Sequence, residues 1–432
     1  MFGPIFVTLA ITIVLLAAGV WVGVGLGVSG VFGLLQILGL DRSLDIVGTI
    51  VWEQNTNFVL LAIPMFILMG ELLFHSGLMS KVYLRAATVV TGLPGGLLQA
   101  NIFACTIFAA CSGSSVASAA TIGSVGYPEI SKRGYDRPIA LGSIAAGGTL
   151  GILIPPSIIF IIYGSLSDVS VGKLFLAGLI PGLLLAGFFS LYIGIRCLLD
   201  RGLSPRVDRV SMVERLRALA GLWQMALLVF VVLGGIYAGV ASPTEVAALG
   251  ASMALLFAIG SGRFNLALVW RAGLATVRQT SMILFIIFTA KILSMTLIYF
   301  RVPAAVVAWV NSYEVTFTHI FLAVVLIYVL LGMFIEGIAM MVLTVPFIMP
   351  VMEVANMDPV WMGVVICIMI EVGLLSPPVG LNLFVLQGVT KEPIRQVIVG
   401  TLPFLVLQLL MVAILYLWPD IALYLPGAVM GG

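Results

Sequence analysis

A run of hydroxyl side chains and two broken apolar stretches are the parts of this sequence best suited to bind ions. The segment Cys111–Ser118, CSGSSVAS, carries four serines inside a region, 86–128, that has no Asp, Glu, Lys or Arg. Small hydroxyl residues in a row favour turns and local side-chain bonding over helix. Such backbone cannot face lipid and must be buried in protein or line a wet cavity. The segment is therefore predicted to be the tip of a helical hairpin.

Two proline pairs interrupt long apolar stretches. They lie in GILIPPSIIF (151–160) and GLLSPPVGLN (373–382). Proline removes a backbone donor and breaks the helix, which frees carbonyl oxygens for other partners. Carbonyl and serine oxygens suit a hard monovalent cation such as Na⁺, and paired half-helix ends attract an anionic substrate. Asn382 stands where the first copy has Phe160, which makes Asn382 a candidate contact. A plain kink satisfied by neighbouring helices is the alternative.

The two stretches belong to an internal repeat with an offset of 222 positions. This offset pairs Gly151 with Gly373, Pro155 with Pro377, Pro128 with Pro350, Asp136 with Asp358 and Gly178 with Gly400. The loop 129–137 holds three basic residues, whereas its counterpart 351–359 holds none. Basic residues mark cytoplasmic loops, so the two halves are predicted to have opposite orientation.

Composition places these elements in a membrane. The chain of 432 residues is 62% hydrophobic and 9% charged, with a mean hydropathy of +1.23. The expected fold is an all-α polytopic membrane protein, with an inverted repeat of two halves and both termini periplasmic. The expected parts are a first repeat (1–200) with a hairpin near 90–128 and a broken helix near 139–165; a cytoplasmic connector (201–220); and a second repeat (221–432) with a hairpin near 316–350 and a broken helix near 360–388.

Other kinds of protein find little support. The four cysteines and two histidines have no metal-ligand spacing, and the basic loops lack the aromatic residues of a nucleic-acid site. No HExxH, GxSxG or His/Asp cluster indicates an enzyme. A channel or passive scaffold remains as an alternative. Four ionisable residues fall inside expected spans and are functional candidates by default: Glu71, Lys291, Glu336 and Glu371. Glu71 and Lys291 lie on helices that could let them pair.

The chain resembles the large membrane (M) subunit of a tripartite ATP-independent periplasmic (TRAP) transporter. The resemblance rests on GVASPTEVAAL (239–249), GILIPPS, GLLSPPVGLN and CSGSSVAS, in the order and spacing of that family. It implies a scaffold with an elevator-type transport domain in the bacterial inner membrane, and Na⁺-driven uptake of an organic acid such as a C4-dicarboxylate or sialic acid. It also implies a periplasmic substrate-binding protein (P) and a small four-helix Q subunit. No four extra spans precede the repeat, so Q is expected as a separate chain.

The resemblance also implies the residues of the sites. Two or more Na⁺ ions are expected, and no organic cofactor. One Na⁺ site would use Ser112, Ser115, Gly148, Gly151 and Pro155, the other Gly337, Thr344, Gly373, Ser376 and Pro377, and the substrate would contact Ser114, Ser157 and Asn382. The second tip has Glu336 in place of Ser114, so carbonyl oxygens should dominate there. A carboxylate/Na⁺ symporter of the same superfamily that needs no binding protein is the alternative.

Overall fold

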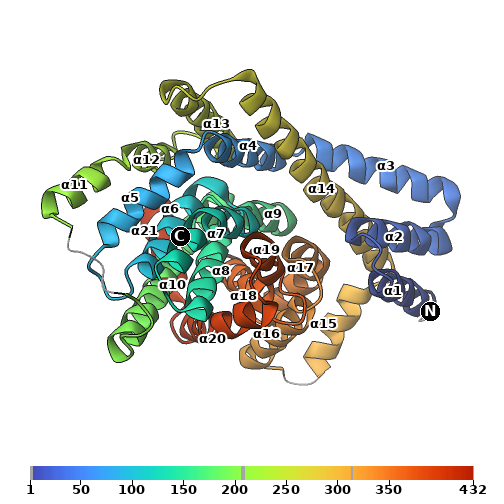
Figure 1. Ribbon diagram of the computed structural model, residues 1–432. Helices are drawn as coiled ribbons and strands as arrows, with labels where there is room; N and C mark the ends of the chain where they lie inside the picture. Colours follow the sequence, from blue (N-terminus) through green and yellow to red (C-terminus); the bar gives the residue numbers. More distant parts are fainter. Residues whose placement is uncertain (1–2, 206–209, 313–314, 432) are drawn as a thin grey trace.

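The fold is all-helical. The structure, a computed structural model, describes residues 3–205, 210–312 and 315–431, and within them the regular elements are helices with one isolated β-bridge (Figure 1). In this part of the chain seven helices are long and apolar enough to cross a membrane, and eight if the bent pair 212–220 and 223–237 is one span. The expected all-α polytopic membrane fold is therefore confirmed.

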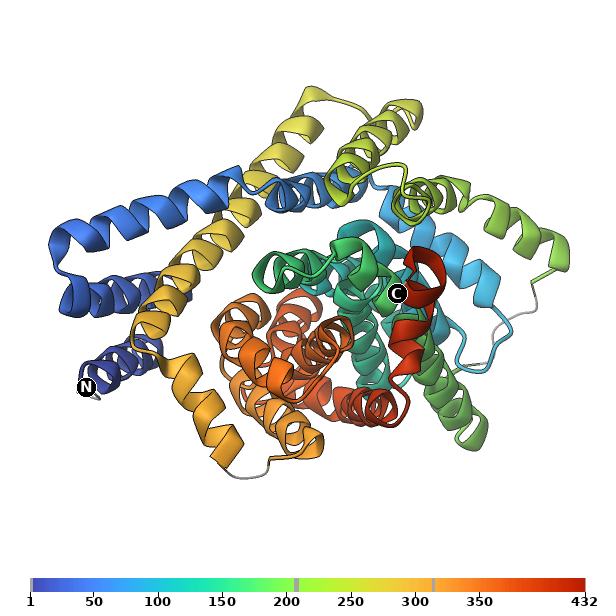
Figure 2. The ribbon, with the colours of Figure 1, turned by 180° about the vertical axis from the view of Figure 1, so that it is seen from behind.

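Two bodies make up the molecule. Figures 1 and 2 show an outer layer of helices that curves along one side of a compact bundle. The outer layer consists of α1 (Gly3–Ala17), α2 (Val22–Leu38), α3 (Leu40–Thr56), η1 (Phe58–Leu61), α4 (Ala62–His75), α11 (Met212–Ala220), α12 (Trp223–Tyr237), α13 (Pro243–Gly260) and α14 (Leu266–Tyr299). Within it α14 packs on α2 and α4, and α4 also packs on α13. Two helices connect the layer to the bundle: α5 (Leu78–Val90) and α15 (Val302–Ser312).

The bundle has the two proline-broken helices at its centre. Its helices are α6 (Leu97–Ser112), α7 (Ser115–Lys132), α8 (Arg137–Leu153), α9 (Ile158–Ser167), α10 (Val171–Leu199), α16 (Phe317–Gly332), α17 (Gly337–Val354), α18 (Pro359–Leu375), α19 (Leu381–Thr390), α20 (Ile394–Leu417) and α21 (Asp420–Met430). Every residue of α8 from Ile139 and of α18 from Val360 is buried. A helix that is apolar on all sides belongs in a protein interior, and these two form the core.

The helix bounds follow the repeat seen in the sequence. The helix α7 begins at residue 115 and ends at 132, and α17 begins at 337 and ends at 354, each 222 positions later. The same offset relates both ends of α8 to both ends of α18. Each half therefore contains a pair of helices joined by a short turn, α6 with α7 (the first turn) and α16 with α17 (the second turn). In each half a broken helix follows, α8 with α9 and α18 with α19, and the break comes after the same number of residues.

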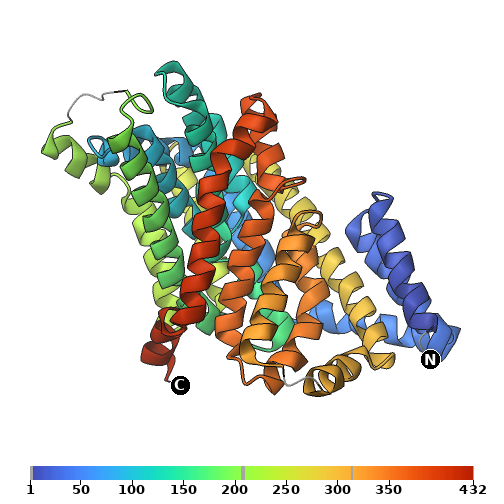
Figure 3. The same ribbon diagram turned by 90° about the horizontal axis from the view of Figure 1, so that it is seen from below.

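The loops that are richest in basic residues lie at one end of the molecule. Arg137 forms an ion pair with Glu392 at 3.3 Å, and Asp136 N donates to Leu203 O at 3.1 Å. Arg85 donates to Gly221 O, and Arg215 donates to Thr91 O. In Figure 3 both chain ends lie at the lower edge, and α11 lies in the upper left part of the molecule. The loops expected in the cytoplasm thus share one end, away from both termini.

One helix extends beyond its expected span. The sequence predicts a cytoplasmic segment with Arg263, Arg271 and Arg278, followed by a span near 280–300. The structure instead has one continuous helix of 34 residues, α14, which starts at Leu266. At 1.5 Å per residue it is about 50 Å long, well beyond a hydrocarbon core of about 30 Å. Arg271 and Arg278 lie near its start, on the part of the helix that exceeds this thickness.

Candidate functional site

A cavity of about 450 Å³ lies between the outer layer and the bundle. From the bundle, both helix-pair turns reach it, with Ser112–Ala117 from the first and Glu336–Ile338 from the second. From the outer layer, α4 supplies Glu71 and α14 supplies Gln279. The remaining lining is mostly apolar. Small-molecule sites are typically concave, apolar and fitted with a few convergent polar groups, and this cavity has that character.

At the first turn, oxygen atoms converge on α8. The Ser112 Oγ lies 3.1 Å from Ser118 Oγ, which in turn donates to Ser114 O at 2.7 Å. A Cβ built on Gly151 would lie 3.0 Å from both Ser118 Oγ and Ser114 O. Glycine at this position therefore lets the oxygens approach the α8 backbone. Hydroxyl and carbonyl oxygens are the donors that a hard cation prefers, so this group fits Na⁺.

The first proline break packs directly behind this turn. Gly113 adopts a left-handed conformation at φ 60°, and a Cβ there would lie 3.0 Å from Pro156 O. Any other residue would be strained at this φ and crowded by the break. The structure thus brings Ser112, Ser115 and Gly151 to the same region, with Gly148 against Ala119 of α7. Of the five residues expected in this ion site, Ser112 and Ser115 line the cavity.

Two of the expected substrate contacts lie behind the cavity wall. Ser157 is fully buried, donates to Ile152 O and caps α9 by accepting from Phe160 N at 3.4 Å. Asn382 is also fully buried, and its Nδ2 donates to Ser115 Oγ at 2.6 Å. Neither residue lines the cavity, whereas Ser114 does. Asn382 therefore orients the Ser115 hydroxyl, and any effect of Asn382 on the cavity passes through Ser115.

At the second turn, backbone contacts replace serines. Gly332 and Gly373 pack so closely that a Cβ on Gly373 would lie 2.8 Å from Gly332 Cα, and Val379 N donates to Met333 O at 3.2 Å. The hydroxyl of Thr344 bonds Tyr328 Oη at 2.6 Å, and that of Ser376 donates to Val372 O at 2.7 Å. Of the residues expected in the second ion site, which are Gly337, Thr344, Gly373, Ser376 and Pro377, only Gly337 lines the cavity.

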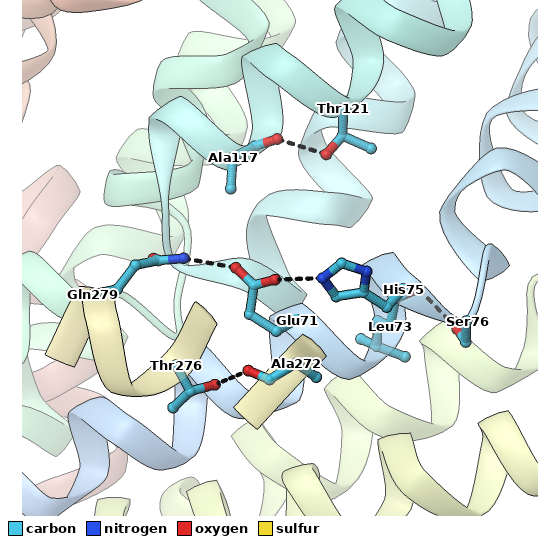
Figure 4. Close-up of polar contacts among 9 residues, drawn as sticks. All are labelled: Glu71, Leu73, His75, Ser76, Ala117, Thr121, Ala272, Thr276 and Gln279. Atoms are coloured by element: carbon cyan, nitrogen blue, oxygen red, sulfur yellow. Dashed lines mark hydrogen bonds and ion pairs between the residues drawn. The ribbon is translucent and has the colours of Figure 1, made fainter. Parts of the chain in front are cut away.

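The wall contributed by the outer layer is built around Glu71. Its carboxylate accepts from Gln279 Nε2 at 2.6 Å and lies 3.4 Å from His75 Nε2. Figure 4 shows Glu71 between these two side chains, with α7 on the opposite side at Ala117 and Thr121. Lys291, which the sequence allowed as a partner of Glu71, is not among the partners of Glu71 in the structure. Lys291 lies on α14 twelve residues, or about 18 Å, beyond Gln279.

Gln279 is the site residue that the sequence analysis missed. It belongs to a polar stretch, Arg278–Ser281, at the start of the span expected near 280–300. The signal that could have found it is Glu71 itself, because a carboxylate within a span requires a donor on a neighbouring helix. The fourth buried candidate, Glu371, lies elsewhere. It is fully buried in the bundle and accepts from Gln408 Nε2 at 3.1 Å.

Helix-pair turns beside broken helices, repeated in both halves of an all-helical membrane protein, are typical of secondary transporters. A family model, the DctM component of the tripartite ATP-independent periplasmic transporter, matches residues 9–421. The chain is 34% identical over 404 residues to a C4-dicarboxylate TRAP transporter large permease protein of Pseudomonas aeruginosa, covering 93% of each chain. It is 31% identical over 368 residues to an ectoine TRAP transporter large permease protein of Halomonas elongata, covering 85% of this chain and 86% of that protein.

A solved structure supports the fold. The YdaH transporter of Alcanivorax borkumensis matches with a TM-score of 0.64 at 17% identity, over 88% of this chain and 89% of that one. The chain belongs to the family of TRAP transporter large permeases, and the resemblance found in the sequence is confirmed. Its relatives are named as permease subunits of transporters, so the protein is a transporter subunit and not an enzyme.

Proposed function

We propose that this protein is the large permease of a Na⁺-coupled system for uptake of a small organic acid across the bacterial inner membrane. The observation that carries the proposal is the cavity, which both helix-pair turns and the outer layer share. A C4-dicarboxylate or sialic acid is the substrate type that the resemblance implies. The periplasmic binding protein would deliver it, and a separate Q subunit would complete the complex.

Two features support Na⁺ as the coupled ion. The first turn gathers the oxygens of Ser112, Ser118 and Ser114 against Gly151, within reach of a single small cation. The second turn packs against its own break through Gly332 and Gly373. Each half thus has a helix-pair turn at a broken helix, as an inverted repeat with one ion site per half requires. Na⁺ bound at either turn would hold that turn in position beside the substrate.

The arrangement of the two bodies supports an elevator mechanism. The cavity lies at their boundary, with Glu71 and Gln279 on the outer layer and the serine turn on the bundle. If the bundle slides against the outer layer, both turns and the bound solute move together. The shared end of the basic loops supports periplasmic termini, because basic loops stay in the cytoplasm.

Reconstituted transport tests the proposal. In proteoliposomes that contain this chain and its Q subunit, uptake is expected only with an inward Na⁺ gradient and the cognate substrate-loaded binding protein. Uptake is measured as internal substrate against time, with K⁺ replacing Na⁺ in the control. Uptake that needs Na⁺ but no binding protein would point to a symporter of the same superfamily. Uptake without either would contradict the proposal and indicate a channel.

Removal of single ion ligands gives a finer prediction. Ser112→Ala and Ser376→Ala are each expected to raise the Na⁺ concentration for half-maximal uptake about five-fold, since one oxygen contact is worth about 1 kcal/mol. The measurement is initial uptake rate against Na⁺ concentration. Ser252→Ala is the control, because Ser252 is exposed and bonds only its own helix at Ala248 O. Unchanged Na⁺ dependence in both variants would remove these hydroxyls from the sites.

A further inference from the structure

A buried amide, Asn382, joins the two halves of the bundle at the first turn. It is the second residue of α19 and is fully buried. Its Nδ2 donates to Ser115 Oγ on α7 at 2.6 Å and lies 3.4 Å from Ala145 O on α8. The Ala145 carbonyl requires a donor on this side of the amide, so the nitrogen and not the oxygen faces Ser115. One side chain of the second half thus contacts both helices that carry the first proposed ion site.

The Ser115 hydroxyl is held differently from the other hydroxyls of this site. Ser115 stands three residues before Ser118, and residues at this spacing are neighbours on one face of a helix. Ser118 Oγ bonds Ser112 Oγ and Ser114 O, so both of these hydroxyls are held from within the first turn. Among the described residues, the hydrogen-bond partner of Ser115 Oγ is Asn382. The position of this oxygen therefore depends on a residue outside the turn.

The bond from Asn382 fixes the direction of the Ser115 hydroxyl. A serine side chain can occupy three staggered rotamers, and a bond of 2.6 Å from a buried amide holds it in one of them. The bond uses one lone pair of Oγ and leaves the other for a cation. A ligand that is held in place before the ion arrives loses less entropy on binding, so the ion binds more tightly.

The equivalent positions of the second half cannot form this contact. The offset of 222 places Phe160 at the position of Asn382 and Gly337 at the position of Ser115. Phenylalanine and glycine carry no polar side-chain group, and Phe160 is fully buried beside Phe175. The contact therefore occurs at one of the two turns, where it makes the first site depend on a residue of the second half.

We propose that Asn382 is a positioning residue for Na⁺ at the first turn, where it holds Ser115 Oγ toward the ion. This inference rests on the proposed function, because it takes the first turn as a Na⁺ site. It gives Asn382 a role behind the cavity wall in place of the substrate contact that the resemblance implies. The helix α19 follows the second proline break and supplies Leu381 to the cavity, so the affinity of the first site depends on where that break holds α19.

Na⁺ binding to the purified complex of this chain with its Q subunit tests the proposal without transport. NaCl replaces choline chloride at constant ionic strength, and the midpoint of thermal unfolding at each Na⁺ concentration gives an apparent Kd. Asn382→Leu keeps the approximate volume of the side chain and removes the donor. It is expected to raise the apparent Kd for Na⁺ about three- to ten-fold, because the Ser115 hydroxyl is then free to occupy all of its rotamers.

The matched control is Asn101→Leu. Asn101 is also fully buried, and its Nδ2 donates to Ser143 Oγ at 2.8 Å between α6 and α8. It lies about 16 Å along α6 from Ser112, away from the first turn. Both substitutions are expected to lower the unfolding midpoint in choline chloride, but only Asn382→Leu is expected to weaken Na⁺ binding. An equal rise of the apparent Kd in both variants would overturn the inference, because the loss of any buried amide would then explain it.

A second substitution shows whether Asn382 acts through Ser115. Ser115→Ala removes the hydroxyl, so Asn382→Leu added to it is expected to change the apparent Kd by less than about two-fold. A further loss as large as that of Asn382→Leu alone would overturn the inference and indicate that Asn382 contacts the ion itself. Asn382→Ala takes the place of Asn382→Leu if the latter does not fold. Failure of both to fold, with Asn101→Leu folded, would mean that the amide is structural and would also overturn the inference.

The same titration separates this inference from the proposed function. If Na⁺ does not shift the unfolding midpoint of the unsubstituted complex, the proposed Na⁺ coupling fails, and this inference fails with it. If Na⁺ stabilises the unsubstituted complex and the Asn382→Leu complex with the same apparent Kd, this inference alone fails. Na⁺-dependent and binding-protein-dependent uptake in proteoliposomes would then still support the proposed function.

Discussion

Gly400→Ala is expected to lower the midpoint of thermal unfolding of the detergent-solubilised protein by about 1–3 °C or more. A Cβ on Gly400 would collide with Pro138 O and lie 3.1 Å from Gly142 N, and a Cβ on Gly142 would collide with Gly400 O. Here α20 meets α8 backbone to backbone, so no side chain can move to make room. The two helices must separate, and overpacking of this kind costs about 1–3 kcal/mol or more.

The matched control is Gly234→Ala on α12. A Cβ there meets nothing within 4 Å, so the substitution adds only helix propensity. It is expected to leave the midpoint unchanged or to raise it slightly, because alanine in a helix adds about 0.5–1 kcal/mol to the free energy of unfolding relative to glycine. Fluorescence-detected size exclusion after heating measures both variants. Equal midpoints for Gly400→Ala and Gly234→Ala would contradict the close approach of α8 and α20.

The same contact has a consequence for transport. The helices α8 and α20 come from opposite halves of the chain, and α8 carries Gly148 and Gly151 toward the first turn. Separation of α8 from α20 would shift the backbone against which the serine oxygens pack. Gly400→Ala protein that still folds is therefore expected to bind Na⁺ more weakly. The measurement is the Na⁺ concentration for half-maximal uptake, which is expected to rise.

The parts of the site that the sequence predicts are those with a local signal. The serine run at 111–118 breaks a helix by its own chemistry, and the chain turns there from α6 to α7 at Gly113. The proline pairs do the same between α8 and α9 and between α18 and α19. The offset of 222 then indicates that both features occur twice. These patterns need no knowledge of which helices are neighbours.

Contacts between distant helices leave no such local signal. Glu71 binds Gln279 across 208 positions, and Asn382 reaches Ser115 across 267. Periodicity and composition locate each of these polar residues in an apolar stretch but do not identify its partner. The length of α14 was missed for a related reason, since its polar start is tolerated beyond the hydrocarbon thickness. Packing between elements determines the partners, and it becomes visible only in the folded chain.

Glu371→Ala is expected to be among the most destabilising single changes in the bundle, by about 2–5 kcal/mol. Glu371 is fully buried, and its Oε2 lies 3.3 Å from Thr149 Oγ1 and 3.1 Å from Gln408 Nε2. Thr149 is the residue 222 positions earlier, so the two copies of one repeat position meet in this contact. The substitution leaves a cavity and deprives two buried polar groups of a partner. The exposed Glu353→Ala is the control and is expected to change stability by less than about 0.5 kcal/mol.

A double substitution shows whether the effect belongs to the network. Gln408→Leu alone removes the amide that donates to both Thr149 and Glu371, and it is also expected to destabilise the protein. Glu371→Met with Gln408→Leu replaces both buried polar groups by apolar ones of similar size, which is often close to neutral. The double variant is therefore expected to be more stable than the sum of its single changes predicts, by about 1–3 kcal/mol in a double-mutant cycle. Additive losses would mean that Glu371 and Gln408 contribute independently. A positive coupling would mean that Glu371 and Gln408 act as one buried network, which also contacts Thr149 of the first half.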